Sequence, residues 1–290
     1  MATTSVHFDA LSLAWRGFWH RLSPAARPQR CPHLHVAWWW LRRSPAGVWF
    51  QNSRYCLDRC LENILGETLH RVPFPARREP AAHRLPLGLL LLSRQQLTGE
   101  QLQVALAAQR AAGRGRLGEW LQALGFATET EVTAALARQW SCPIFGSSSF
   151  FPGARHAPRI PLGLLERFSM VPVHYVPSTS ILHLAFAEGV DYTVLYAIEQ
   201  MAGCHTEACF ATPSFVRAQL AQLGAHRAES EIVFSHFPDS AEVCGIIRSY
   251  CSRLHASEIK LARCGSHLWV RLLRNSRSPV DLILNSPSAY

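Results

Sequence analysis

Cysteine and histidine side chains near the N-terminus of this 290-residue chain follow each other at spacings that metal sites use. Cys31 and His35 precede an aromatic-rich stretch, and Cys56 and Cys60 follow it at the start of an expected helix. His33 is an alternative to His35. Structural zinc is held by four such ligands in a tetrahedron. The pattern predicts a zinc site formed by Cys31, His35, Cys56 and Cys60, with reduced, buried cysteines as the alternative.

Two signatures of catalysis are missing from the sequence. The phosphate-binding loop of ATPases needs a glycine followed by lysine and then serine or threonine. Lys260 is the only lysine, and it lies between Ile259 and Leu261, so no such loop exists. Cys204 and His205 are sequence neighbours and lack the activating signature of a cysteine nucleophile. We therefore predict no catalytic residues and no use of ATP.

A repeat with an offset of 30 residues is the most informative pattern in the chain. Its matched positions are Leu87 and Leu117, Gly88 and Gly118, Leu91 and Leu121, Leu102 and Val132, Leu106 and Leu136, and Gln109 and Gln139. Each copy is expected to form a short helix, a turn and a longer helix. Thr98 with Gln101, and Thr128 with Glu131, are capping boxes that predict where the longer helices begin.

The repeat lies within a chain of the α+β class. We expect a helical tandem-repeat subdomain and then a small α/β subdomain, with a short Cys/His module before them and a degenerate α/β tail after them. The corresponding parts are a poorly ordered lead-in (1–30), the Cys/His module (31–72), a proline-rich linker (73–84), the main domain (85–226, with helical repeats at 85–140 and the α/β part at 161–226) and the tail (241–290).

Alternating apolar residues and turn signals predict the elements of the α/β part and the tail. The expected helices are 57–69 in the Cys/His module, then 162–168, a helix capped by Asp191 and running to Met201, 214–223, and 241–254. The expected strands are 171–176, 181–186, 207–211, 258–262, 267–273 and 280–284.

Composition limits the compartment and the partners. The net charge of +9 favours an anionic partner, but the arginines are scattered instead of forming one tract, which argues against nucleic acid. Nine cysteines at irregular spacings, without an apolar leader, favour reduced thiols and a cytoplasmic location. No apolar run approaches the roughly 18–20 residues that cross a bilayer, so no membrane insertion is expected.

The tandem motif resembles the MshEN-type N-terminal domain of the ATPases of type II secretion and type IV pilus assembly, the GspE/PilB/MshE family. That motif has an Arg-Leu-Gly start, paired aliphatic residues, a glycine followed by aliphatic residues, and spaced leucines that end in glutamine. The resemblance covers residues 85–226. Ala256 to Leu261 resembles a degenerate form of the segment that leads into the ATPase core of that family. The ATPase core itself is expected to be absent.

In that family the paired motifs can bind cyclic di-GMP, so the resemblance implies a set of ligand-binding residues. They are Leu87, Gly88, Leu91, Leu92, Gln109, Arg116, Leu117, Gly118, Leu121, Gly125, Phe126 and Gln139. An arginine offers a planar donor to guanine or phosphate, and glycine lets the backbone approach a ligand. The first copy departs from the motif, because Pro86 takes the arginine position and Gln95 a glycine position. Arg84 is the nearest substitute.

Three functions follow from these patterns. The leading hypothesis is a non-catalytic adaptor or regulatory protein that docks onto a secretion or pilus assembly component. The second is a sensor that binds cyclic di-GMP through the tandem motif. The third is a zinc-dependent nucleic-acid-binding protein.

Overall fold

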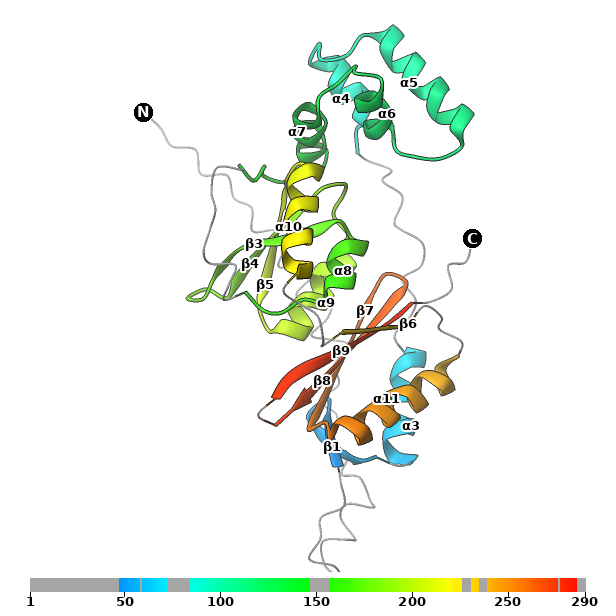
Figure 1. Ribbon diagram of the computed structural model, residues 1–290, viewed down its shortest axis with the longest axis vertical. Helices are drawn as coiled ribbons and strands as arrows, with labels where there is room; N and C mark the ends of the chain where they lie inside the picture. The colour runs from blue at the N-terminus through cyan, green and yellow to red at the C-terminus, as the bar shows by residue number, and fades with distance from the viewer. Residues whose placement is uncertain are drawn as a thin grey trace, which may run out of the picture.

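The computed structural model describes residues 47–57, 59–71, 84–146, 157–225, 231–234, 239–275 and 277–285. A helical region lies at one end of the long axis, a three-stranded sheet lies in the middle, and a six-stranded sheet with two helices lies at the other end (Figure 1). The chain is therefore mixed α+β, as predicted. The predicted lead-in 1–30 and most of the predicted linker lie outside the described residues.

The tandem repeat forms four helices: α4 (Leu87–Ser93), α5 (Gly99–Ala112), α6 (Leu117–Ala123) and α7 (Glu129–Gln139). The long helices α5 and α7 begin at the two predicted capping boxes. Thr98 accepts a hydrogen bond from the Gln101 N–H, and Thr128 accepts one from the Glu131 N–H. In each case the side chain of the third helical residue accepts from the N–H of the capping threonine, which satisfies two otherwise unpaired donors.

The α/β part follows in the predicted order. Its elements are α8 (Leu162–Arg167), β3 (Met170–Val176), β4 (Ile181–Phe186), α9 (Tyr192–Ala202), β5 (His205–Phe210) and α10 (Pro213–Ala225). Strand β4 lies between β3, to which it is antiparallel, and β5, to which it is parallel. The Asp191 side chain caps α9 by accepting from the Thr193 N–H.

The two ends of the described chain share one sheet, with strand order β2-β1-β7-β8-β9-β6. The strands are β1 (Gly47–Phe50), β2 (Ser53–Cys56), β6 (Glu231–Phe234), β7 (Glu258–Cys264), β8 (His267–Arg274) and β9 (Arg277–Asn285), and the helices are α3 (Arg59–Arg71) and α11 (Ser240–Leu254). Strand β1 pairs in parallel with β7. The pairing corrects the prediction that 31–72 and 241–290 are separate parts, and β1, β2 and β6 are strands that local alternation did not predict. These strands have four residues each, too few to show a clear alternation.

This six-stranded sheet is covered on both faces, because alternate residues of a strand point to opposite sides. Leu268, Val270 and Leu272 of β8 pack with α3 and α11 in one core. Trp269 and Ile283 point the other way, into a core shared with α8, α9 and the three-stranded sheet. The α/β part and the six-stranded sheet are thus joined by a continuous apolar core. In the described part of the chain, no helix is long and apolar enough to cross a membrane.

Candidate functional site

The two copies of the motif pack against each other reciprocally. A Cβ added at Gly88 would lie 2.7 Å from Leu102 Cδ1 and 3.4 Å from Cδ2 of Leu117, the leucine that begins the second copy. A Cβ added at Gly118 would lie 2.9 Å from Val132 Cγ1 and 3.5 Å from the leucine that begins the first copy. Since Leu102 and Val132 are equivalent positions, the helical region has quasi-two-fold symmetry. Both glycines permit the close approach of the two copies.

The glutamines that end the motifs hold the two copies together. Gln109 Nε2 donates to the Gly115 carbonyl at 2.9 Å, and Gln139 Nε2 donates to the Leu85 carbonyl at 2.7 Å. Each carbonyl belongs to the residue two positions before a Leu-Gly pair, so the two contacts are equivalent in the repeat. One N–H of each of the predicted ligand-binding amides, those of Gln109 and Gln139, therefore donates to the chain itself.

The aliphatic positions of the motif form the core of the helical region. Leu91 and Leu121 are fully buried. Four further predicted positions pack around them and are partly buried: Leu87, Leu92, Leu117 and Phe126. The apolar part of the predicted site thus packs the repeat itself.

The turn after each short helix shows where the copies differ. Gly125 has a φ of 71°, and Gln95, at the equivalent position, has a φ of 58°. Glycine adopts this left-handed conformation readily, whereas another residue is strained by roughly 1–2 kcal/mol. Gln95, which replaces the glycine of the motif in the first copy, therefore keeps the left-handed backbone conformation and adds strain.

Arg116 of the predicted site, and Arg84 as its nearest substitute in the first copy, contact different parts of the chain. Arg116 Nη1 lies 2.7 Å from Glu188 Oε2, in the loop between β4 and α9, and the Arg116 side chain is 53% exposed. The Arg84 guanidinium lies 3.3 Å from the ring centroid of Trp140, whose ring neighbours Tyr192. Sequence reasoning missed Glu188, because nothing in its local sequence marks it as a partner of Arg116. A half-exposed ion pair of this kind contributes about 0.2–1 kcal/mol.

The first copy exposes apolar side chains where the second does not. Leu85 is 62% exposed and Leu89 is 51% exposed. The equivalent positions of the second copy hold Gly115 and Glu119. Sequence reasoning did not single out these leucines, although the signal was present: residues 85–92 contain more leucines than one buried helix face requires.

The zinc prediction concerns residues that the structure describes only in part. Cys31 and His35 lie outside the described residues. Cys56 is buried in the core beneath α3 and α11, and Cys60 packs against the same core. Within the described ranges, no group of three or more His, Cys, Asp or Glu side chains is arranged to hold a metal. The four-ligand site stays a prediction.

The buried thiols are poorly suited to nucleophilic chemistry. Burial raises the pKa of the Cys209 and Cys251 thiols to about 12. Burial and the nearby Glu199 carboxylate raise the pKa of Cys204 as well. Because the thiolate is the reactive form, these cysteines are inert near neutral pH.

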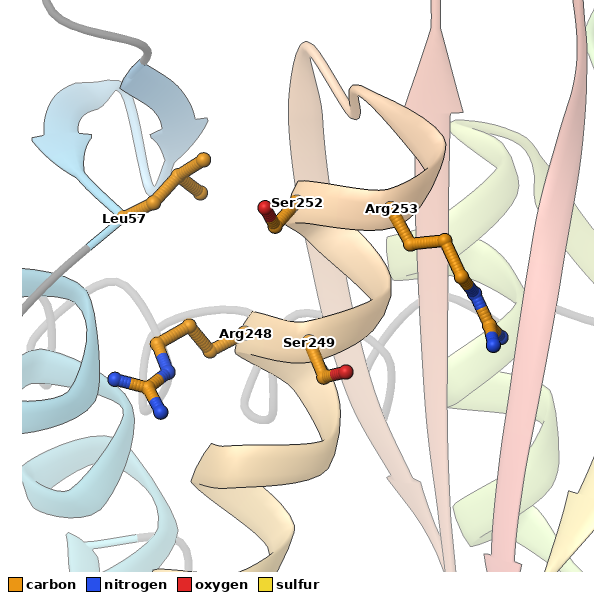
Figure 2. Close-up of a pocket in the computed structure, with 5 residues that line it drawn as sticks. All are labelled: Leu57, Arg248, Ser249, Ser252 and Arg253. Carbon is orange, nitrogen blue, oxygen red and sulfur yellow. The ribbon is translucent and has the colours of Figure 1, made fainter.

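A hollow of about 430 Å³ lies beside α11 and the turn after β2, lined by Leu57, Arg248, Ser249, Ser252 and Arg253. Figure 2 shows that the two arginines point in different directions from α11. Arg248 Nε lies 3.1 Å from Glu62 Oε1, and the Arg253 guanidinium lies over the Tyr250 ring. The two charges do not converge, so the hollow is a weak candidate for an anion site.

Comparison with known proteins gives matches among solved structures. No protein-family model matches the sequence. No curated protein matches it either. The chain is similar to a structure of MshE with cdg, at 26% identity and a TM-score of 0.41, over 48% of this chain and 99% of that one. It is also similar to two structures of the N-terminal domain of XpsE, at 20% identity and TM-scores of 0.39 and 0.28, over 50% of this chain and 97% of each. The matched region covers about half of this chain.

Proposed function

We propose that this chain is a non-catalytic adaptor or regulatory protein that docks through α4 onto a component of a type II secretion or type IV pilus assembly system. This proposal rests on the exposure of Leu85 and Leu89, at positions where the second repeat has Gly115 and Glu119. The copy that has Pro86 in place of the arginine of the motif is the copy that exposes these two leucines. An exposed apolar helix face is a recurrent means of binding a partner helix or groove.

The contacts inside the repeat support docking over ligand binding. The amides of Gln109 and Gln139 hold carbonyls within the chain, and Arg116 is paired with Glu188. A ligand that used the same N–H groups would compete with these contacts. Docking on α4 displaces none of them, and the helical region projects at one end of the molecule (Figure 1).

Leu89→Glu tests the adaptor function. The fold should tolerate this change, because the second repeat carries Glu119 at the equivalent exposed position. Placing a charge in the docking surface should weaken binding by about 30-fold, as expected for a central interface residue. The measurement is calorimetric titration of the full chain with purified cytoplasmic parts of secretion and pilus assembly components.

Tyr196→Glu is the matched control, because Tyr196 on α9 is 52% exposed and lies outside α4. It should bind with the affinity of the unmodified chain. Equal binding by the Leu89→Glu variant, or no complex with any component, would contradict the proposed function.

Binding of cyclic di-GMP is the second candidate, favoured by the half-exposed Arg116 guanidinium at the start of the intact motif. If the ligand binds there, Arg116→Ala should abolish the calorimetric signal. Glu188→Gln should strengthen binding several-fold, because the arginine would no longer be paired with a carboxylate. An absence of heat at high micromolar ligand with the unmodified chain would remove this candidate.

A further inference from the structure

The charged residues around the exposed leucines at α4 are all cationic in the first copy of the repeat. Arg84 directly precedes Leu85, and Arg94 directly follows α4. The segment 84–98 holds these two arginines and contains no aspartate or glutamate. The equivalent residues of the second copy are Arg114, Gly115, Glu119 and Leu124. The second copy therefore has a carboxylate at the position of Leu89 and no charge at the position of Arg94.

Arg94 lies at the C-terminal end of α4 with its charge available. Its backbone N–H donates to the Leu91 carbonyl at 3.2 Å, so the chain is fixed at this residue. Arg94 is exposed, and within the described part of the chain no carboxylate forms an ion pair with it. Because the second copy has Leu124 at the equivalent position, the repeat folds without a charge there. The Arg94 guanidinium can therefore pair with a carboxylate of a partner.

Arg84 lies before the opposite, N-terminal end of α4 and is held in place. Its guanidinium lies 3.3 Å from the centroid of the Trp140 ring. The carbonyl of the next residue, Leu85, accepts a hydrogen bond from Gln139 Nε2 at 2.7 Å, which fixes the backbone. A guanidinium over an aromatic face keeps its charge and its N–H donors. A cation therefore lies near each end of α4.

The surface between these two arginines is apolar. Leu85 is 62% exposed and Leu89 is 51% exposed. Helix α4 itself contains no charged residue, and its seven residues extend over about 10 Å. An apolar strip of this length matches two turns of a partner helix, whose residues at intervals of three and four lie on one face. An acidic residue at each end of that face would meet an arginine.

We propose that the α4 surface binds an amphipathic helix of the partner protein, with apolar residues on Leu85 and Leu89 and an acidic residue beside each of Arg84 and Arg94. The inference rests on the proposed adaptor function and names the class of partner that its docking surface takes. Two arginines separated by leucines favour a protein over nucleic acid or a membrane surface, which attract longer runs of cations. Charge pairing at the rim of an apolar contact fixes its register and excludes partners of the wrong charge.

Two fluorescein-labelled helical peptides provide the probes. Both carry the same leucines on one face, and the ends of that face hold glutamates in one peptide and lysines in the other. In anisotropy titrations the unmodified full chain should bind the glutamate peptide at least about tenfold more tightly, because like charges repel at the rim. Arg94→Glu should weaken binding of the glutamate peptide and strengthen binding of the lysine peptide, a gain that also shows the variant is folded. Arg217→Glu on α10 should leave both affinities unchanged.

Several outcomes would overturn the inference. These are equal binding of the two peptides or of neither, an unchanged preference in the Arg94→Glu chain, and tighter Arg94-dependent binding of phosphatidylglycerol vesicles. If Leu89→Glu abolishes the complex with a component and Arg94→Glu does not affect it, the adaptor function stands and the acidic helix fails. If the glutamate peptide binds as expected and no component does, the class of partner stands and the adaptor function fails.

Discussion

Replacing Asp281 with alanine should lower the free energy of unfolding by about 3–5 kcal/mol, the usual effect of removing one partner of a buried ion pair. Asp281 is 1% exposed and accepts hydrogen bonds from Arg271 Nε at 2.7 Å and from Trp269 Nε1 at 2.8 Å. Arg271 also donates to the Arg159 carbonyl at 2.6 Å, which ties β8 to the segment before α8. Without the carboxylate, a buried guanidinium and a buried indole N–H lose their acceptor.

Urea denaturation followed by circular dichroism measures this effect. Arg274→Ala is the control on the paired strand β8, because the hydrogen bonds from Arg274 to the Ser278 carbonyl are exposed. It should change the free energy of unfolding by less than about 1 kcal/mol. The double change Arg271→Met with Asp281→Leu should recover most of the lost stability, since no charge is then buried alone. A loss below about 1 kcal/mol for Asp281→Ala would show that the pair is not buried in solution.

Replacing Gly118 with valine should destabilise the helical region by about 2–3 kcal/mol through overpacking. The first added carbon would already lie 2.9 Å from Val132 Cγ1. Val132 is 4% exposed, and a β-branched side chain has few rotamers into which it can move. Relief then requires α6 to move away from α7, which would also displace the leucine of α4 that packs on Gly118.

Gly66→Val in α3 is the matched control, because nothing lies within 4 Å of a Cβ added at Gly66. Valine has a somewhat better helix propensity than glycine, so this change should be neutral or slightly stabilising, by up to about 0.5 kcal/mol. Both variants are compared by urea denaturation. Equal stabilities would mean that Gly118 does not serve close packing. A selective loss in the Gly118→Val chain should also weaken docking through α4.

Local patterns in the sequence predicted much of the helical region and of the α/β part. The capping boxes at Thr98 and Thr128 predicted where α5 and α7 begin, because a cap depends on residues three positions apart. The 30-residue offset identified Gly88 and Gly118 as equivalent positions, and the structure gives them equivalent neighbours. The motif alone could not show that Gln139 donates to the Leu85 carbonyl, since the two residues are far apart in the sequence.

The sequence by itself determined the duplication, the absence of an ATPase phosphate-binding loop and the order of most helices and strands, because each depends on residue identity and short-range spacing. Only the tertiary structure decided that β1 pairs with β7, that Arg116 faces Glu188, and that Gln139 donates to the Leu85 carbonyl. These features join residues that are distant in the chain. Their formation depends on which surfaces are buried together. A local sequence pattern does not specify which surfaces these are.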